Sequence, residues 1–305
     1  MIRFLSKNIT LSGWIVLTII YCLNTTCSGP EKSVFSKENI TPWCIVPFDA
    51  KQRNPRERAE MLERLGLKTL AYDWRENNIS EFDEEIIQLK KHGISMTAFW
   101  WAGGLPQSEE ELKASEIMNI QLDFLKRNAL NLDVWVTLSD YNLEDKTDEQ
   151  KSSILAAQID VLASELKEYG CRLGLYNHGG WGGQPKNMVE TIKKVKSGNV
   201  GIVYNFHHAH EHLEMMPEAF ELMLPYLYCV NLNGMNPGGP KILTLGQGEE
   251  DVKILKMIKE SGYSGPIGII GHIEDEDVEV VLKRNLDGLK NLLAEIGDTE
   301  ALKTW

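Results

Sequence analysis

Residues 171–208 read CRLGLYNHGGWGGQPKNMVETIKKVKSGNVGIVYNFHH, with a short apolar run at each end of a helical segment. The runs, residues 171–177 and 200–206, are nearly continuous in apolar residues, which is typical of parallel strands buried on both faces. Glycines follow the first run, and Gly198 is predicted to end the helix before the second run begins. The segment therefore predicts a strand–helix–strand unit with parallel strands.

The same unit recurs along the chain, where eight apolar runs alternate with amphipathic segments. The runs are residues 43–48, 67–73, 94–101, 132–138, 171–177, 200–206, 227–233 and 266–271. Eight such units within residues 40–297 match the number and size of a closed barrel. An open, doubly wound sheet is the alternative, and it is disfavoured because no glycine-rich phosphate loop follows the first run. We therefore predict an α/β fold, a single (β/α)8 TIM barrel.

The predicted helices begin at polar residues that can accept hydrogen bonds from free backbone amides. Asn54 stands before Pro55, a residue favoured in the first turn of a helix. Ser80, Ser108 and Thr147 each stand three residues before an acidic residue or a glutamine, which is the spacing of a capping box.

Composition and charge narrow the classes of partner. The 305 residues are 43% hydrophobic and 25% charged, which is ordinary for a globular protein. The formal net charge of −12 argues against a nucleic-acid partner and against an acidic membrane surface. A small neutral or cationic ligand is compatible with this charge.

Residues 1–29 are predicted to be an export signal that precedes the fold. Arg3 and Lys7 form a basic start, and the apolar segment 11–23 is too short to cross a bilayer of about 30 Å as a helix. Cys27 resembles the lipidated cysteine of bacterial lipoproteins, so a lipid anchor at Cys27 and simple cleavage near Gly29 both stay open. The mature protein is expected in the periplasm or anchored to a membrane.

Six of the seven histidines follow three of the predicted strands, at His178, His207, His208, His210, His212 and His272. Because the C-terminal ends of barrel strands meet at one face, His178, His208 and His272 are predicted to share one pocket. Imidazole binds transition metals and titrates near neutral pH. These three are therefore candidate metal ligands, and His208 and His272 are also candidate general bases. The other three are expected to be packing or surface residues.

Further polar and aromatic residues stand at the same strand ends. Asp73 ends the second run and is a candidate catalytic carboxylate. Side-chain amides can hydrogen bond sugar hydroxyls, and indoles can stack on the apolar face of a sugar ring. The candidate substrate-binding residues of these two types are Asn177, Asn205, Asn233, Trp74, Trp101 and Trp181.

Four segments resemble, in this order, the xylose-isomerase-like TIM-barrel superfamily, the sugar phosphate isomerase/epimerase group. They are Leu-Tyr-Asn177-His178-Gly-Gly, Asn205-Phe-His-His208, Leu245-Gly-Gln247-Gly and Gly262-Tyr-Ser-Gly-Pro-Ile-Gly. The resemblance is to an exported bacterial branch, and it implies a small carbohydrate substrate and proton transfer next to a carbonyl. It also implies a divalent metal at the strand ends, and it adds Gln247 to the candidate substrate-binding residues.

The chain departs from the group's pattern at the metal-binding positions. Asn205 stands where the group often has aspartate, and His178 and His272 stand where it has glutamate. A set of imidazoles with few carboxylates favours a softer ion, Zn, Mn, Co or Fe, over Mg²⁺, or no metal at all. We predict a divalent transition metal on His178, His208 and His272, and no organic cofactor.

Three functions are compatible with these residues. The first is an isomerase, epimerase or keto-sugar lyase. The second is a non-catalytic sugar-binding barrel with a degenerate metal site. The third is a glycoside hydrolase, for which Asp73 and Asp140 are the candidate carboxylate pair. The sequence leaves the sugar and the oligomeric state open.

Overall fold

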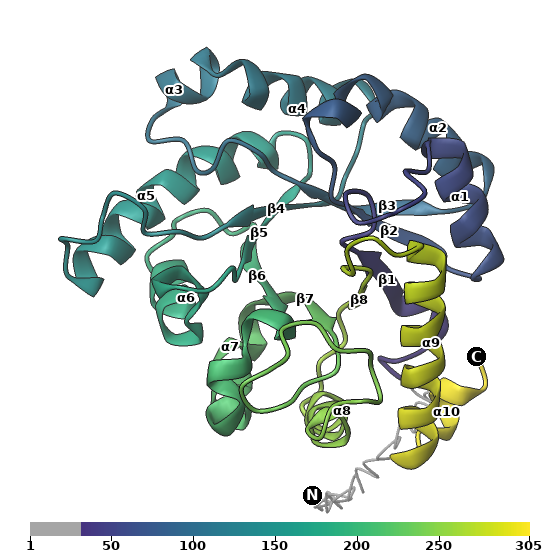
Figure 1. The fold of residues 1–305 in the computed structure, drawn as a ribbon. Coiled ribbons are helices and arrows are strands. Elements are labelled where there is room, and N and C mark those ends of the chain that lie inside the picture. The colour runs from purple at the N-terminus through teal and green to yellow at the C-terminus, as the bar shows by residue number, and fades with distance from the viewer. Residues whose placement is uncertain (1–31) are drawn as a thin grey trace, which may run out of the picture. The chain divides into compact units, whose positions relative to one another are not determined.

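A computed structural model describes residues 32–305, in which eight parallel strands form a ring surrounded by helices (Figure 1). The strands are β1 Ile40–Trp43, β2 Thr69–Tyr72, β3 Ser95–Trp100, β4 Asp133–Thr137, β5 Arg172–Tyr176, β6 Val200–Asn205, β7 Leu227–Leu232 and β8 Ile267–Ile270. They pair in the order β1-β8-β7-β6-β5-β4-β3-β2. β1 and β2 meet through side chains, because the hydroxyls of Thr41 and Thr69 lie 2.8 Å apart. The predicted (β/α)8 barrel is confirmed.

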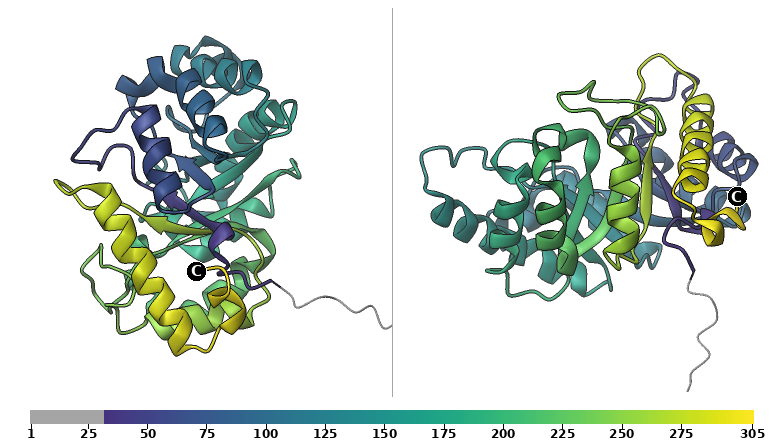
Figure 2. Two further views of the ribbon diagram at one scale, coloured as in Figure 1. Left: turned by 90° about the vertical axis from the view of Figure 1, so that its right-hand side faces the viewer. Right: turned by 90° about the horizontal axis from the view of Figure 1, so that it is seen from below.

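The helices cover the outside of this ring. The α-helices are α1 Pro55–Arg64, α2 Phe82–Lys91, α3 Glu109–Ala114, α4 Glu116–Arg127, α5 Asp148–Lys167, α6 Pro185–Ile192, α7 Met216–Met223, α8 Asp251–Glu260, α9 Val278–Glu295 and α10 Thr299–Leu302. The 3-10 helices are η1 Lys37–Asn39, η2 Glu76–Glu81, η3 Trp181–Gly183, η4 Phe206–His208, η5 His210–Met215 and η6 Leu224–Tyr226. In the right-hand view of Figure 2, the loops after β7 and β8 rise from the same end of the barrel.

Three of the four predicted helix starts are confirmed. The side chains of Asn54, Ser108 and Thr147 each accept a hydrogen bond from the backbone amide three residues on. The prediction for Ser80 is wrong, because Ser80 lies inside η2 and α2 begins at Phe82.

Two other predicted boundaries are also wrong. β1 ends at Trp43, where the predicted strand began, because Cys44 has a φ of 55° that interrupts the extended backbone. Helix α6 ends at Ile192, well before Gly198. The residues after α6 are held instead by the carboxylate of Asp160, which accepts hydrogen bonds from the backbone amides of Lys196 and Ser197.

The barrel has an inner and an outer core. The outer core lies between the strands and the helices and holds most of the buried aliphatic residues. The inner core lies inside the ring and consists of Trp43, Cys44, Ala71, Ala98, Trp135, Tyr176, Val203, Cys229 and Ile270. Its indole rings are accommodated by small neighbours. A Cβ at Gly174 would lie 3.0 Å from the Trp135 ring and 2.6 Å from Val203.

The last residues pack against the first described ones (Figure 2, left). The indole of Trp305 donates to the carbonyl of Phe35, and the Ser33 hydroxyl donates to Asp298. Within residues 32–305, no helix is both long enough and apolar enough to cross a membrane. The predicted export signal, with Cys27, lies outside the described residues and stays a prediction.

Candidate functional site

A pocket of about 100 Å³ lies at the C-terminal ends of the barrel strands. Its lining residues are Trp43, Cys44, Phe48, Arg75, Trp100, Tyr176, His178, His207, His208, Lys241 and His272. The inner core forms the floor, where the Trp43 indole donates to the Tyr176 hydroxyl at 3.1 Å. The site therefore rests on the buried aromatic residues inside the barrel.

Four imidazoles surround this pocket, and they come from the ends of β5, β6 and β8. The ring centroids of His178 and His208 are 4.5 Å apart, and those of His207 and His208 are 3.9 Å apart. His272 lies 6.5 Å from His207 and stacks on Phe48 at 3.6 Å. The predicted convergence of His178, His208 and His272 is thus present in the structure, with His207 as a fourth member.

All four imidazoles are uncharged at neutral pH. Burial lowers the pKa of each ring, and the ammonium group of Lys241 lowers it further. Burial, the neighbouring ring of His178 and the ammonium group of Lys241 together lower the pKa of His208 to about 3. By contrast with His210, whose ring nitrogens contact two backbone carbonyls, these rings make no hydrogen bond to another group within residues 32–305. Their ring nitrogens are therefore free to contact a ligand.

Two cationic side chains complete the lining. Arg75 follows β2, and its guanidinium donates to the backbone carbonyls of Asp73 and Trp74 at 2.7 and 2.9 Å. Lys241 lies on the loop after β7, where its carbonyl accepts hydrogen bonds from His210 and Asn233. Neither cation forms an ion pair with a carboxylate in the part of the chain that the structure describes. Both cations were missed in the sequence, where nothing distinguishes them from other surface cations.

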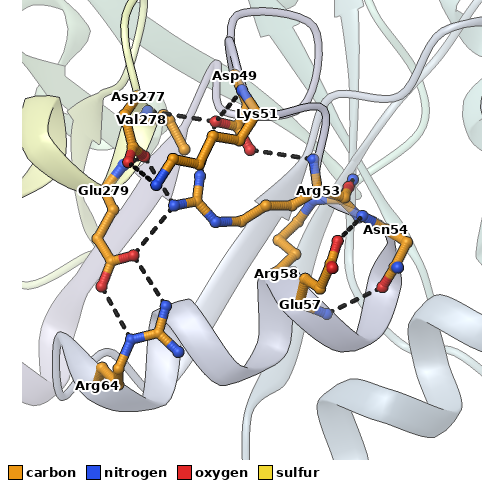
Figure 3. A network of polar contacts seen from close by, with 10 residues as sticks. All are labelled: Asp49, Lys51, Arg53, Asn54, Glu57, Arg58, Arg64, Asp277, Val278 and Glu279. Atoms are coloured by element: carbon orange, nitrogen blue, oxygen red, sulfur yellow. Dashed lines mark hydrogen bonds and ion pairs between the residues drawn. The ribbon is translucent and has the colours of Figure 1, made fainter.

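A network of ion pairs connects the residues after β1 to the start of α9 (Figure 3). Arg53 donates to Asp49 and to Asp277, both at 2.7 Å, and also to Glu279. Asp49 in turn accepts from the backbone amide of Val278 at the start of α9. The network joins the loop after β1 to the loop after β8, and these loops carry the stacked rings of Phe48 and His272.

Asp73, a predicted catalytic residue, lies beside the pocket but does not line it. One carboxylate oxygen accepts from the backbone amides of Ile45 and Val46 at 3.3 and 3.2 Å, while the other is buried without a partner among the described residues. Burial raises the pKa of Asp73 to about 7. The contacts place Asp73 as a support for the loop after β1.

The three predicted asparagines, Asn177, Asn205 and Asn233, hydrogen bond to neighbouring protein groups, together with Asn231, which the prediction did not include. Asn177 and Asn205 hydrogen bond each other at 2.9 Å, and Asn231 donates to Asn205 at 2.5 Å. Asn233 donates to the backbone carbonyls of Gly234 and Lys241. All four are buried and do not line the pocket. Asn177, Asn205 and Asn231 join the ends of β5, β6 and β7, whereas Asn233 holds the loop after β7.

The predicted tryptophans and Gln247 also lie away from the pocket. Trp74 and Trp101 are only 2% and 1% exposed in the outer core, so the expectation that they stand at the rim is not met. The indole of Trp181 donates a hydrogen bond to the carboxylate of Asp148 at the start of α5. Gln247 is exposed and lines a separate hollow beside α9. The aromatic residues of the pocket are instead Trp43, Trp100, Phe48 and Tyr176.

A larger groove of about 950 Å³ lies on the outer surface between α7 and α8. Its lining includes Phe220 and Met257 together with lysines and glutamates. It contains no histidine and lies on the helical exterior, whereas ligand sites in barrels of this type form at the strand ends. The smaller pocket is therefore the candidate site.

The pocket does not fit the predicted divalent metal. Within residues 32–305, no three histidine, cysteine, aspartate or glutamate side chains converge in a way that could hold an ion. No carboxylate lines the pocket, and the ammonium of Lys241 would repel a divalent cation there. His178, His208 and His272 share the pocket, but they do not form a metal site in it.

Residues 57–292 match the family model for the xylose isomerase-like TIM barrel. The chain is similar to the apo form of 3-keto-D-glucoside 4-epimerase from Escherichia coli, at 16% identity and a TM-score of 0.64, over 85% of this chain and 100% of that one. It is also similar to a xylose isomerase-like TIM barrel protein from Mycobacterium smegmatis in complex with magnesium, at 15% identity and a TM-score of 0.55, over 87% and 100% of the chains. At these identities the likeness shows the fold.

One curated relative is similar in sequence over a shorter region. An uncharacterized protein from Methanocaldococcus jannaschii is 27% identical over 114 residues, which cover 34% of this chain and 38% of that protein. The match thus spans less than half of the relative's length, whereas the family model covers most of the barrel. Because the family model matches residues 57–292, more than half of the chain, the chain belongs to the xylose isomerase-like TIM barrel family.

Proposed function

We propose that the chain is an enzyme that isomerises or epimerises a small carbohydrate by moving a proton at the carbon next to a carbonyl group. The observation that supports this proposal is a group of four neutral imidazoles around one pocket, whose ring nitrogens have no hydrogen-bond partner within residues 32–305. Proton transfer needs a base within hydrogen-bond distance of the reacting carbon, and such nitrogens meet this need. The Escherichia coli structure similar to this chain is an epimerase of a keto-sugar derivative.

The pocket residues divide into two roles under this proposal. Removing a proton next to a carbonyl puts negative charge on the carbonyl oxygen, and Lys241 and Arg75 supply the positive charge that stabilises it. His208, with a pKa of about 3, is a weak base and serves better as a neutral hydrogen-bond donor to that oxygen. His178 and His272 are then the candidate bases.

A non-catalytic sugar-binding barrel is the second candidate, because the described residues hold no metal-ligand cluster. A glycoside hydrolase has less support. Hydrolysis uses two carboxyl groups on either side of the scissile bond. Asp73 is bonded to backbone amides and Asp140 to Lys151, and neither lines the pocket.

The reaction is tested by incubating the purified protein with aldoses, ketoses and 3-keto-sugars in D₂O, and following the sugars by NMR. We expect deuterium to enter at the carbon next to the carbonyl of at least one sugar, with formation of its isomer or epimer. The variants of the two candidate bases are His178→Asn and His272→Asn. At least one of them is expected to lower the exchange rate by about 100-fold or more, the usual contribution of a positioned acid or base.

His212→Asn is the matched control, because His212 lies outside the pocket and its substitution is expected to leave the rate unchanged. Sugar binding without any deuterium exchange would favour the non-catalytic barrel and contradict the proposed enzyme. Hydrolysis of a glycoside with no exchange would favour the hydrolase.

A further inference from the structure

The pocket has a charge opposite to that of the whole chain. The protein carries a net charge of −12, yet its eleven pocket-lining residues include two cations and no aspartate or glutamate. Two acidic residues lie near this lining. Asp73 accepts hydrogen bonds from the backbone amides of Ile45 and Val46. Glu274 is an exposed residue close to His272.

The two cations are directed at the pocket rather than at neighbouring carboxylates. Arg75 is oriented by its hydrogen bonds to two backbone carbonyls, which leaves its other nitrogens available. Lys241 acts electrostatically on His178, His207, His208 and His272, so its ammonium lies close to all four rings. Elsewhere in the described chain, the buried cations Arg53 and Lys151 are paired with carboxylates.

We infer that the pocket binds a negatively charged oxygen group, a carboxylate or a phosphate, on its carbohydrate ligand, through Lys241, Arg75 and imidazole N–H groups. An oxyanion accepts charge-assisted hydrogen bonds from all of these donors. The inference rests on the proposed function and names its substrate class as acidic sugars. It differs from the neutral or cationic ligand with which the net charge of the chain is compatible.

The size of the pocket agrees with this assignment. A volume of about 100 Å³ is small beside the roughly 300–1,000 Å³ of pockets that bury most of a drug-sized ligand. We therefore expect the pocket to enclose the charged end of the ligand rather than the whole ligand. The rest of the ligand would extend toward the loops that carry Arg75 and Lys241, both of which are exposed.

The inference is tested by calorimetric binding of matched ligands in the presence of a chelator. The ligands are D-glucose, D-glucuronate and D-glucose 6-phosphate, which share one ring and differ in their charged group. We expect one of the two acids to bind about tenfold or more tightly than glucose. A tenfold difference is about the smallest contribution expected from one hydrogen bond to a charged group. The better acid identifies carboxylate or phosphate as the group bound.

Lys241→Met is expected to abolish the preference for the acid. Lys290→Met, at an exposed lysine of α9 outside the pocket, is expected to retain it and serves as the matched control. Equal affinity for glucose and both acids, an unchanged preference in Lys241→Met, or acid binding that requires an added divalent metal would each overturn the inference. Deuterium exchange on neutral sugars alone would overturn it while leaving the proposed function intact. Tight binding of an acid without any deuterium exchange would support the inference and contradict the proposed function.

Discussion

Asp73 is a buried carboxyl group whose two oxygens have unequal surroundings. Two backbone amides bond one oxygen, while the other has no partner among the described residues. Burial opposes ionisation and raises the pKa of Asp73 from 3.8 to about 7, although Arg75 and the two amides act in the other direction. The folded protein therefore holds a proton on Asp73 that the unfolded chain has already released between these two pH values.

This proton predicts how stability depends on pH. Since the folded state binds more protons between pH 3.8 and about 7, the contribution of Asp73 to stability falls as pH rises through that interval. Asp73→Asn keeps an oxygen for the two amides and removes the titration. As the pH is raised from about 5 to 8, the free energy of unfolding measured in urea is expected to fall in the wild type by roughly 1–3 kcal/mol more than in the variant. An identical pH slope in the two proteins would contradict the assigned pKa.

His207 shows what the sequence could not reveal about single residues. Successive residues of a strand point to opposite sides, so an extended chain could place only one of His207 and His208 in the pocket. The chain instead forms η4 directly after β6, and both rings line the pocket. Lys241 was missed for a related reason. Its position depends on the loop after β7, which no local pattern describes.

At the scale of elements, the ion pairs of Arg53 hold α9 against the loop after β1 (Figure 3). Arg53 and Asp49 are 8% and 7% exposed, so their pairing is little screened by water. Removing one partner of such a pair leaves the other charge buried without compensation. The Phe48–His272 stack depends on both joined loops, so the network also positions one wall of the pocket.

Arg53→Met is expected to lower the free energy of unfolding by roughly 2–4 kcal/mol, because Asp49 loses its charged partner in a buried setting. It is also expected to weaken ligand binding, since His272 loses part of its support. Arg56→Met is the control. Arg56 is exposed and lies 4.0 Å from Glu60, so its loss is expected to change stability by less than about 1 kcal/mol. Equal losses in the two variants in chemical denaturation would contradict the role of the network.

The elements were predictable where a residue pattern has a direct physical cause. Asn54, Ser108 and Thr147 satisfy free amides at helix starts, and this chemistry needs only local sequence. Two predicted boundaries were wrong for reasons that no local pattern shows. The left-handed backbone of Cys44 ends β1 at Trp43, and the contacts of Asp160 hold the residues between α6 and Gly198. The asparagines were correctly placed at strand ends, but an amide there can bond a neighbouring strand as readily as a sugar.

At the scale of the whole molecule, the barrel brings distant segments of the chain to one end. Residues from the loops after β1, β2, β5, β6, β7 and β8 meet in the pocket, while the inner core below holds their strands in place. The fold was predictable because eight repeated apolar runs leave few arrangements for parallel strands. The charge of the pocket was not predictable, because the net charge of the chain averages over surfaces that never meet a ligand.

The central claim is that four neutral imidazoles surround the pocket without a metal. It is tested most directly by long-range ¹H–¹⁵N NMR of the histidine rings during a pH titration, with assignments from single His→Asn variants. We predict that His178, His207, His208 and His272 titrate below the ordinary value of about 6.5, that His208 is still neutral near pH 4, and that added Zn²⁺ leaves their shifts unchanged. Protonation of these rings near pH 6.5, or a stoichiometric shift of their nitrogens with Zn²⁺, would contradict the account.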